Sequence, residues 1–172
     1  MFNRRNVIQS MAALAAPGVG LPAWAREPEG PLPKVGSTLP LPSLTLLDGR
    51  RWTPADAQGK VLVVYWWASW CPFCALQSPH IEALWRAQKD QGLDVLALSI
   101  DWQPAAAASY MKAKGYSFPA GMLTPEVGKL LPKPAGLPVV VVMKVTGRNG
   151  KVVFAESGEM FSEDVEGLKK YL

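Results

Sequence analysis

Histidine and cysteine are both scarce in this sequence. The 172 residues include one histidine, His80, and two cysteines, Cys71 and Cys74. A closed structural zinc site takes four Cys or His ligands, and a disulfide-dense scaffold needs more than one cysteine pair, so the composition argues against both. A Ser-His-Asp or Cys-His mechanism would have to use His80, which we interpret instead as a surface or helix-packing residue. We predict no metal site.

Charge is also low. The formal net charge is +4 and charged residues make up 19% of the chain. Such a small excess does not indicate a nucleic-acid partner. With 49% hydrophobic residues, the chain can bury the core of one ordinary domain and is not expected to be disordered.

The N-terminal region lacks an apolar run long enough to cross a bilayer, which takes about 20 residues. It opens with Arg4 and Arg5, continues with a small-residue stretch from Met11 to Leu21, and reaches the sequence Ala23-Trp24-Ala25. This order is typical of an export signal, and we predict that residues 1–25 are removed by cleavage after Ala25. The paired arginines also resemble a twin-arginine motif, so that route and the general secretory route both stay open.

Prolines are frequent in residues 26–43, which we predict to be an extended lead-in rather than a structural element. Residues 44–172 are predicted to form one domain, and Asp48-Gly49 predicts a hairpin over residues 44–52. The remaining expected elements are strands at 61–66, 95–100, 139–142 and 151–155, and helices at 72–89, at 105–114 and after an N-cap at Ser162.

The order of these elements predicts their arrangement in a sheet. Strand–helix–strand units favour parallel pairs, whereas a turn at 146–150, with its Asn149-Gly150 step, favours an antiparallel pair. We therefore expect one mixed α/β sheet with helices on both faces.

Both cysteines belong to one Cys-x-x-Cys motif between an expected strand and an expected helix. Cys71 would lie at the helix N-terminus, where unpaired N–H groups and the helix dipole favour a thiolate. A thiolate is the nucleophile of thiol–disulfide exchange. Cys74, one helical turn later, is within reach to resolve the mixed disulfide, and Pro72 costs no hydrogen bond at the first helical position.

Two other uses of the cysteine pair stay open. A purely structural disulfide across so short a loop would contribute only about 2 kcal/mol in the loop-entropy model. The two thiolates would also suit Cu(I), which prefers soft ligands. Trp70 and Phe73 flank the sulfurs and, with Pro72, are expected to form an apolar rim for a partner.

These residues resemble the thioredoxin superfamily, and within it the exported TlpA/ResA-like thiol–disulfide oxidoreductases. The resemblance covers nearly all of the chain after the expected signal. Its landmarks are Gly36-Ser37 to Leu46, Gly59-Lys60-Val61 to Cys74, Pro79, Phe118-Pro119, Gly136-Leu137-Pro138 and Asn149-Gly150-Lys151.

The resemblance implies a thioredoxin-like mixed sheet with an extra N-terminal hairpin. It also implies a cis Leu137–Pro138 bond facing the cysteines, with Leu137 pairing backbone-to-backbone with a client strand. Cys71 and Cys74 would form the redox disulfide, with no other cofactor. The expected partners are client proteins with cysteine pairs, such as apocytochromes c or copper-site proteins, and a membrane electron donor. We expect a monomer in the periplasm or otherwise exported.

Two positions depart from the family pattern. Tyr65 occupies the position, six residues before Cys71, where many thioredoxins bury an acidic residue, and a tyrosine cannot act as a base near neutral pH. Some members bury a glutamate after the second core strand, and Trp102 aligns better with it than Asp101. Asp101 is nevertheless the candidate proton acceptor for Cys74, with a helix cap or a solvated charge as the alternative.

The preferred function is an exported protein-disulfide reductase. A disulfide oxidase or isomerase remains the alternative within the class, because the residues between the cysteines do not set the direction. A Cu(I)-handling binding protein is the alternative from another class. A peroxidase is disfavoured, since the chain has no separate, distant resolving cysteine.

Overall fold

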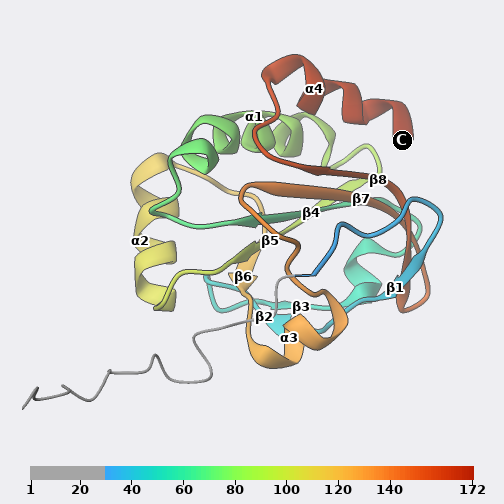
Figure 1. Ribbon diagram of the computed structural model, residues 1–172, viewed down its shortest axis with the longest axis horizontal. Helices are drawn as coiled ribbons and strands as arrows, with labels where there is room; N and C mark the ends of the chain where they lie inside the picture. Colours follow the sequence, from blue (N-terminus) through green and yellow to red (C-terminus); the bar gives the residue numbers. More distant parts are fainter. Residues whose placement is uncertain (1–29) are drawn as a thin grey trace, which may run out of the picture.

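The computed structural model describes residues 30–172, and the predicted signal over residues 1–25 lies outside that range. A six-stranded sheet runs through the centre, in the order β1-β8-β7-β4-β5-β6 (Figure 1). Strands β4 (Val61–Trp67), β5 (Leu93–Ser99) and β6 (Ala120–Met122) are parallel. The antiparallel strands are β1 (Thr38–Pro40), β7 (Val139–Thr146) and β8 (Asn149–Ser157). The mixed sheet is therefore confirmed.

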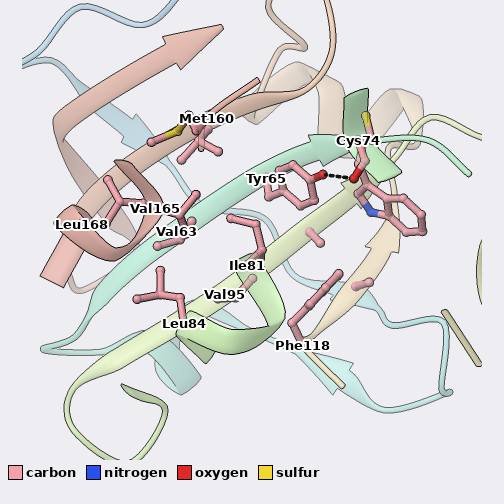
Figure 2. Close-up of a cluster of buried hydrophobic side chains, with 14 of the residues drawn as sticks. Val63, Tyr65, Cys74, Ile81, Leu84, Val95, Phe118, Met160, Val165 and Leu168 are labelled. Carbon is pink, nitrogen blue, oxygen red and sulfur yellow. Dashed lines mark hydrogen bonds between the residues drawn. The ribbon is translucent and has the colours of Figure 1, made fainter. Parts of the chain in front are cut away.

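Strand β4 has hydrophobic side chains throughout, and all seven of its residues are buried. Because alternate side chains of a strand point to opposite faces, Trp66 and Trp67 pack into different cores. The core on the Trp67 face includes residues of α1 (Pro72–Gln88), α2 (Pro104–Lys114) and α4 (Ser162–Glu166), and Figure 2 shows part of it.

The opposite core is covered by a hairpin and a short helix. Strands β2 (Leu44–Thr45) and β3 (Arg51–Trp52) pair antiparallel around the Asp48-Gly49 turn, which confirms the predicted hairpin. Helix α3 (Pro125–Leu130) contributes Val127 to the same core. Helices therefore cover both faces of the sheet. The remaining elements are the 3-10 helices η2 (Pro54–Ala57) and η3 (Gly167–Tyr171).

The predicted lead-in is partly wrong, because Thr38–Pro40 forms strand β1 and pairs with β8. The frequent prolines of this segment predict an extended lead-in without an element. However, β1 is an edge strand of the sheet, and proline is tolerated on edge strands because one side of the strand needs no ladder donor. The lead-in is thus tied to the sheet by its last few residues.

Strand β6 and helix α3 were not predicted. The strand is three residues long and contains Gly121, which carries no side chain to give a strand pattern. A Cβ at Gly121 would collide with the Leu44 side chain, so the glycine permits the hairpin to approach the sheet. Helix α3 begins at Pro125, and the Thr124 hydroxyl accepts a hydrogen bond from the Val127 amide at 3.3 Å.

Two local assignments near the C-terminus are corrected. The β7–β8 turn lies at Gly147 and Arg148, so the expected Asn149-Gly150 step belongs to β8 instead. Gly147 has φ of +61°, which suits a tight hairpin turn, whereas Gly150 leaves room for the Met143 side chain. Helix α4 is capped by Phe161 rather than Ser162, and the Phe161 amide donates to the Asp164 carboxylate at 3.1 Å. No helix of residues 30–172 has the length and hydrophobicity of a membrane span.

Candidate redox site

Cys71 and Cys74 form a disulfide where strand β4 leads into helix α1. Cys71 is the N-cap residue, and its sulfur accepts a hydrogen bond from the Cys74 amide at 3.1 Å. Pro72 occupies the first helical position, as expected from its missing N–H. Both cysteines are buried, with 4% and 1% of their surface exposed, so a client sulfur has only a narrow approach to Cys71.

The surroundings of Cys71 favour a thiolate once the disulfide is reduced. The first turn of α1 contains no acidic residue. The helix N-terminus carries a partial positive charge, and the Cys74 N–H already points at the Cys71 sulfur. These features agree with the prediction that Cys71 is the nucleophile and Cys74 the resolving cysteine, and the two roles stay a prediction.

Tyr65 lies beneath the motif on strand β4. Its hydroxyl is 3.0 Å from the Ser78 hydroxyl and donates to the Cys74 carbonyl at 3.4 Å (Figure 2). Burial raises the pKa of Tyr65 far above its usual range, and the hydrogen bond with Ser78 offsets only part of that effect. The residue therefore stays neutral at physiological pH, and a neutral hydroxyl stands where many thioredoxins place a carboxylate.

Asp101 is buried just beyond the end of strand β5, with 7% of its surface exposed. Its carboxylate accepts hydrogen bonds from the Ser69 amide at 3.0 Å and the Ser69 hydroxyl at 2.5 Å, and from the Ser99 hydroxyl at 2.7 Å. The alternative of a helix cap or solvated charge is therefore wrong. These bonds hold the segment that leads into Cys71, and the role as proton acceptor for Cys74 stays a prediction.

The Leu137–Pro138 peptide bond is cis, as predicted. Val139, the next residue, pairs with Trp66 near the end of β4, so the bond lies at the same end of the sheet as Cys71. The Pro138 carbonyl accepts a hydrogen bond from the Gly158 amide at 2.9 Å. Within residues 30–172, neither the N–H nor the C=O of Leu137 takes part in a hydrogen bond, which leaves both groups available to an incoming strand.

An exposed apolar rim surrounds the buried disulfide. Trp70 and Phe73 expose 58% and 54% of their surfaces, and Pro72 is exposed between them. The prediction missed Leu76 of the same helix, which is exposed to 57%. Leu76 follows Phe73 by three residues, which is helical spacing, so the sequence did contain a signal for it.

His80 lies half-buried on helix α1, six residues beyond Cys74. This placement agrees with its interpretation as a surface or helix-packing residue. Within residues 30–172, no group of three or more His, Cys, Asp or Glu side chains is arranged to hold a metal ion.

Comparisons with known proteins agree on the kind of molecule. The family model described as Redoxin matches residues 34–172. The thiol-disulfide oxidoreductase ResA of Bacillus anthracis is 26% identical over 137 residues, covering 80% of this chain and 78% of that protein. ResA of Bacillus subtilis is also 26% identical, over 135 residues that cover 78% of this chain and 75% of that protein.

Solved structures share the fold. A thiol:disulfide interchange protein of the thioredoxin family from Chlorobium tepidum superposes with a TM-score of 0.69 at 24% identity, covering 78% of this chain and 96% of that one. A secreted disulfide oxidoreductase from Mycobacterium tuberculosis has a TM-score of 0.63 at 21% identity, with 76% and 95% covered. The expected thioredoxin-like architecture is therefore confirmed.

Proposed function

Because the chain belongs to the Redoxin family and is a ResA-like thiol-disulfide oxidoreductase, we propose that it acts as a protein-disulfide reductase. The observation that carries the proposal is the sulfur pair itself. Cys71 caps the N-terminus of α1, its sulfur accepts the Cys74 amide, and the two cysteines form a disulfide. This is the arrangement in which one sulfur attacks and the other resolves.

The reaction transfers two electrons from the reduced pair to a client disulfide. The Cys71 thiolate attacks one client sulfur, the client S–S bond breaks, and the other client sulfur leaves as a thiolate. The Cys74 thiol then loses its proton, for which Asp101 is the predicted acceptor, and its sulfur attacks Cys71. The second client sulfur leaves, the Cys71–Cys74 disulfide forms, and the client takes up two protons to become a dithiol.

Client docking uses the cis-proline loop, which lies at the same end of the sheet as the disulfide. Leu137 offers an N–H and a C=O that pair with no other group of the described chain, so a client strand can add to this edge by backbone hydrogen bonds. Pro138 carries no N–H to compete for the same strand. The exposed side chains of Trp70, Pro72 and Phe73 supply apolar contacts around the cysteine under attack.

The N-terminal sequence supports an extracytoplasmic setting for the reaction. The basic start and the small residues before Ala25 support export by cleavage of residues 1–25. In the bacterial envelope the protein would act as a monomer on a few clients, such as apocytochromes c or copper-site proteins. A membrane electron donor would return it to the dithiol form, and the disulfide would be its only redox group.

The direction of electron flow is tested by the reduction potential of the cysteine pair. We expect a value near or below about −270 mV, the thioredoxin value, measured in dithiothreitol redox buffers with tryptophan fluorescence as readout. The same protein should accelerate insulin reduction, and Cys71→Ser should abolish that activity.

A reduction potential nearer about −120 mV, in the range of strong envelope oxidants, would reverse the assigned direction. Stoichiometric binding of Cu(I) without insulin reduction would instead support the copper-handling alternative.

A further inference from the structure

A buried lysine lies in the loop that leads to the cis-proline. Lys133 has 6% of its surface exposed. Its ammonium donates to the Pro134 carbonyl at 2.9 Å and to the Gly136 carbonyl at 3.3 Å. Burying an ammonium is unfavourable unless hydrogen bonds replace its water. Here two such bonds go to residues of the segment just before Leu137.

The composition of the loop explains why a side chain has this task. Pro132 and Pro134 have no N–H, so the backbone on either side of Lys133 offers few donors. An ammonium has three donors and no acceptor, and it can therefore donate to several carbonyl groups at once. Gly136 has φ of +83°, a conformation that side-chain-bearing residues rarely adopt.

The rest of the loop is fixed from two other directions. The Gly30 amide donates to the Lys133 carbonyl at 2.8 Å, and the Ala135 amide donates to the Gly30 carbonyl at 3.0 Å. The Ser157 hydroxyl donates to the Ala135 carbonyl at 3.0 Å. Counting partners within residues 30–172, every carbonyl from residue 133 to residue 138 thus accepts a hydrogen bond except that of Leu137.

We propose that Lys133 is a positioning residue for client docking. Its ammonium holds the Pro134 and Gly136 carbonyls inward, so that the backbone of Leu137 is presented in one conformation to the client strand. The inference rests on the proposed function, since it gives a task to the same docking edge. In this role Lys133 takes no part in the transfer of electrons.

The test compares a protein substrate with a small one. Lys133→Met removes the donors and keeps an apolar stem of similar length, and Lys129→Met is the matched control because Lys129 is an exposed lysine on α3. For Lys133→Met we expect kcat/KM for insulin to fall about tenfold, the effect of losing hydrogen bonds to a charged group. The rate with hydroxyethyl disulfide, which has no backbone to pair, should stay within about twofold of the wild type.

Equal loss with both substrates, failure of Lys133→Met to fold, or an insulin rate equal to that of Lys129→Met would each overturn the proposal. The first two outcomes would make Lys133 a general structural residue, and the third would give it no task in docking.

A second readout needs no client. The amide hydrogen of Ala135 is bonded to Gly30, between the two carbonyls that Lys133 holds. Lys133→Met should speed its exchange with solvent about tenfold or more, as measured by NMR, and leave the β4 amides unchanged. Unchanged exchange at Ala135 would contradict the clamp. If the wild-type protein failed to reduce insulin, the proposed function would be wrong, whereas this exchange result would still decide what Lys133 does to the loop.

Discussion

Two segments approach the disulfide, and buried charges of opposite sign hold them. The segment before Cys71 is held by the Asp101 carboxylate, which accepts from the Ser69 amide and hydroxyl. The segment before Pro138 is held by the Lys133 ammonium, which donates to two carbonyls. The first segment presents donors and the second, with its prolines, presents acceptors. The sign of the buried charge therefore follows from what the backbone leaves unpaired.

The largest loss of stability is expected from removing the Asp101 carboxylate. Asp101→Ala leaves the Ser69 amide and two hydroxyls without their partner in a buried place, so the free energy of unfolding should fall by about 3 kcal/mol. Asp101→Asn keeps one acceptor oxygen and should lose about half as much. Urea denaturation of the oxidised protein measures both variants. A loss below about 1 kcal/mol for the alanine variant would contradict the claim that this carboxylate holds the segment before Cys71.

Asp101→Asn also tests the predicted proton transfer from Cys74. If the carboxylate only positions Ser69, the thiol pKa of Cys74 and the rate of the resolving step should match the wild type. A slower resolving step with an unchanged fold would instead make Asp101 the proton acceptor.

Glu82 is a second buried carboxylate that binds a loop, but this loop does not lead to either cysteine. It can therefore be compared with Asp101. It accepts hydrogen bonds from the Ser117 amide at 2.8 Å and the Ser117 hydroxyl at 2.6 Å, and from the Phe118 amide at 3.1 Å. Glu82→Gln should lower the free energy of unfolding by about 2 kcal/mol and leave the insulin rate unchanged. A variant that folds normally but loses activity would contradict this separation.

The pH dependence of Glu82 has a definite sign. Burial raises its pKa, but hydrogen bonds from Ser117, Arg86 and the Phe118 amide outweigh that effect, and the pKa lies below the ordinary value. Its stabilising contribution is therefore complete above the unfolded-state pKa of about 4.3 and is lost as the pH falls through the folded-state value. The stability of Glu82→Gln should depend less on pH in this acid range.

A smaller effect is expected from Tyr65→Phe, which removes a neutral hydroxyl beneath the cysteines. The loss of its contacts with Ser78 and the Cys74 carbonyl should cost about 1 kcal/mol of stability. Since Tyr65 does not ionise near neutral pH, the pH–rate profile from about pH 6 to 9 should keep its shape. A shift of the profile would assign Tyr65 a part in proton transfer.

The smallest effect is expected from Ser157→Ala. This change removes one restraint from the Ala135 carbonyl while the Lys133 clamp remains. We expect a loss of about 0.5 kcal/mol in stability and an insulin rate within about twofold of the wild type. If kcat/KM for insulin fell as far as in Lys133→Met, the Ser157 hydroxyl and the Lys133 ammonium would contribute equally to positioning the loop.

Some parts of the site could be predicted from the sequence, and others could not. The cysteine spacing and the strand-to-helix boundary are local features, so the sequence indicates the position of Cys71 without a fold. The partners of Asp101 are different, because Ser69 lies 32 residues earlier in the chain. Sequence reasoning identified Asp101 as a candidate but could not identify what its carboxylate would contact.

The sequence does not indicate a role for Lys133, since a lysine between two prolines is typical of an exposed loop. Only the tertiary structure shows that it is buried and that its ammonium faces backbone carbonyls. Strand β6 was not predicted for a related reason. Its Gly121 leaves room for the Leu44 side chain, which belongs to a hairpin distant in sequence. The hydrophobic periodicity of a sequence indicates which residues of one element are buried, but it does not show how the side chains of two elements pack together.

The bridge between Gly30 and the cis-proline loop has a practical consequence for handling this protein. Gly30 exchanges hydrogen bonds with Lys133 and Ala135, so any sequence joined just ahead of it starts beside the edge where we propose that clients dock. The other terminus ends after η3, and Leu172 is exposed to 45%. An affinity tag or a fluorescent reporter therefore belongs after Leu172, where its linker leaves the docking loop clear.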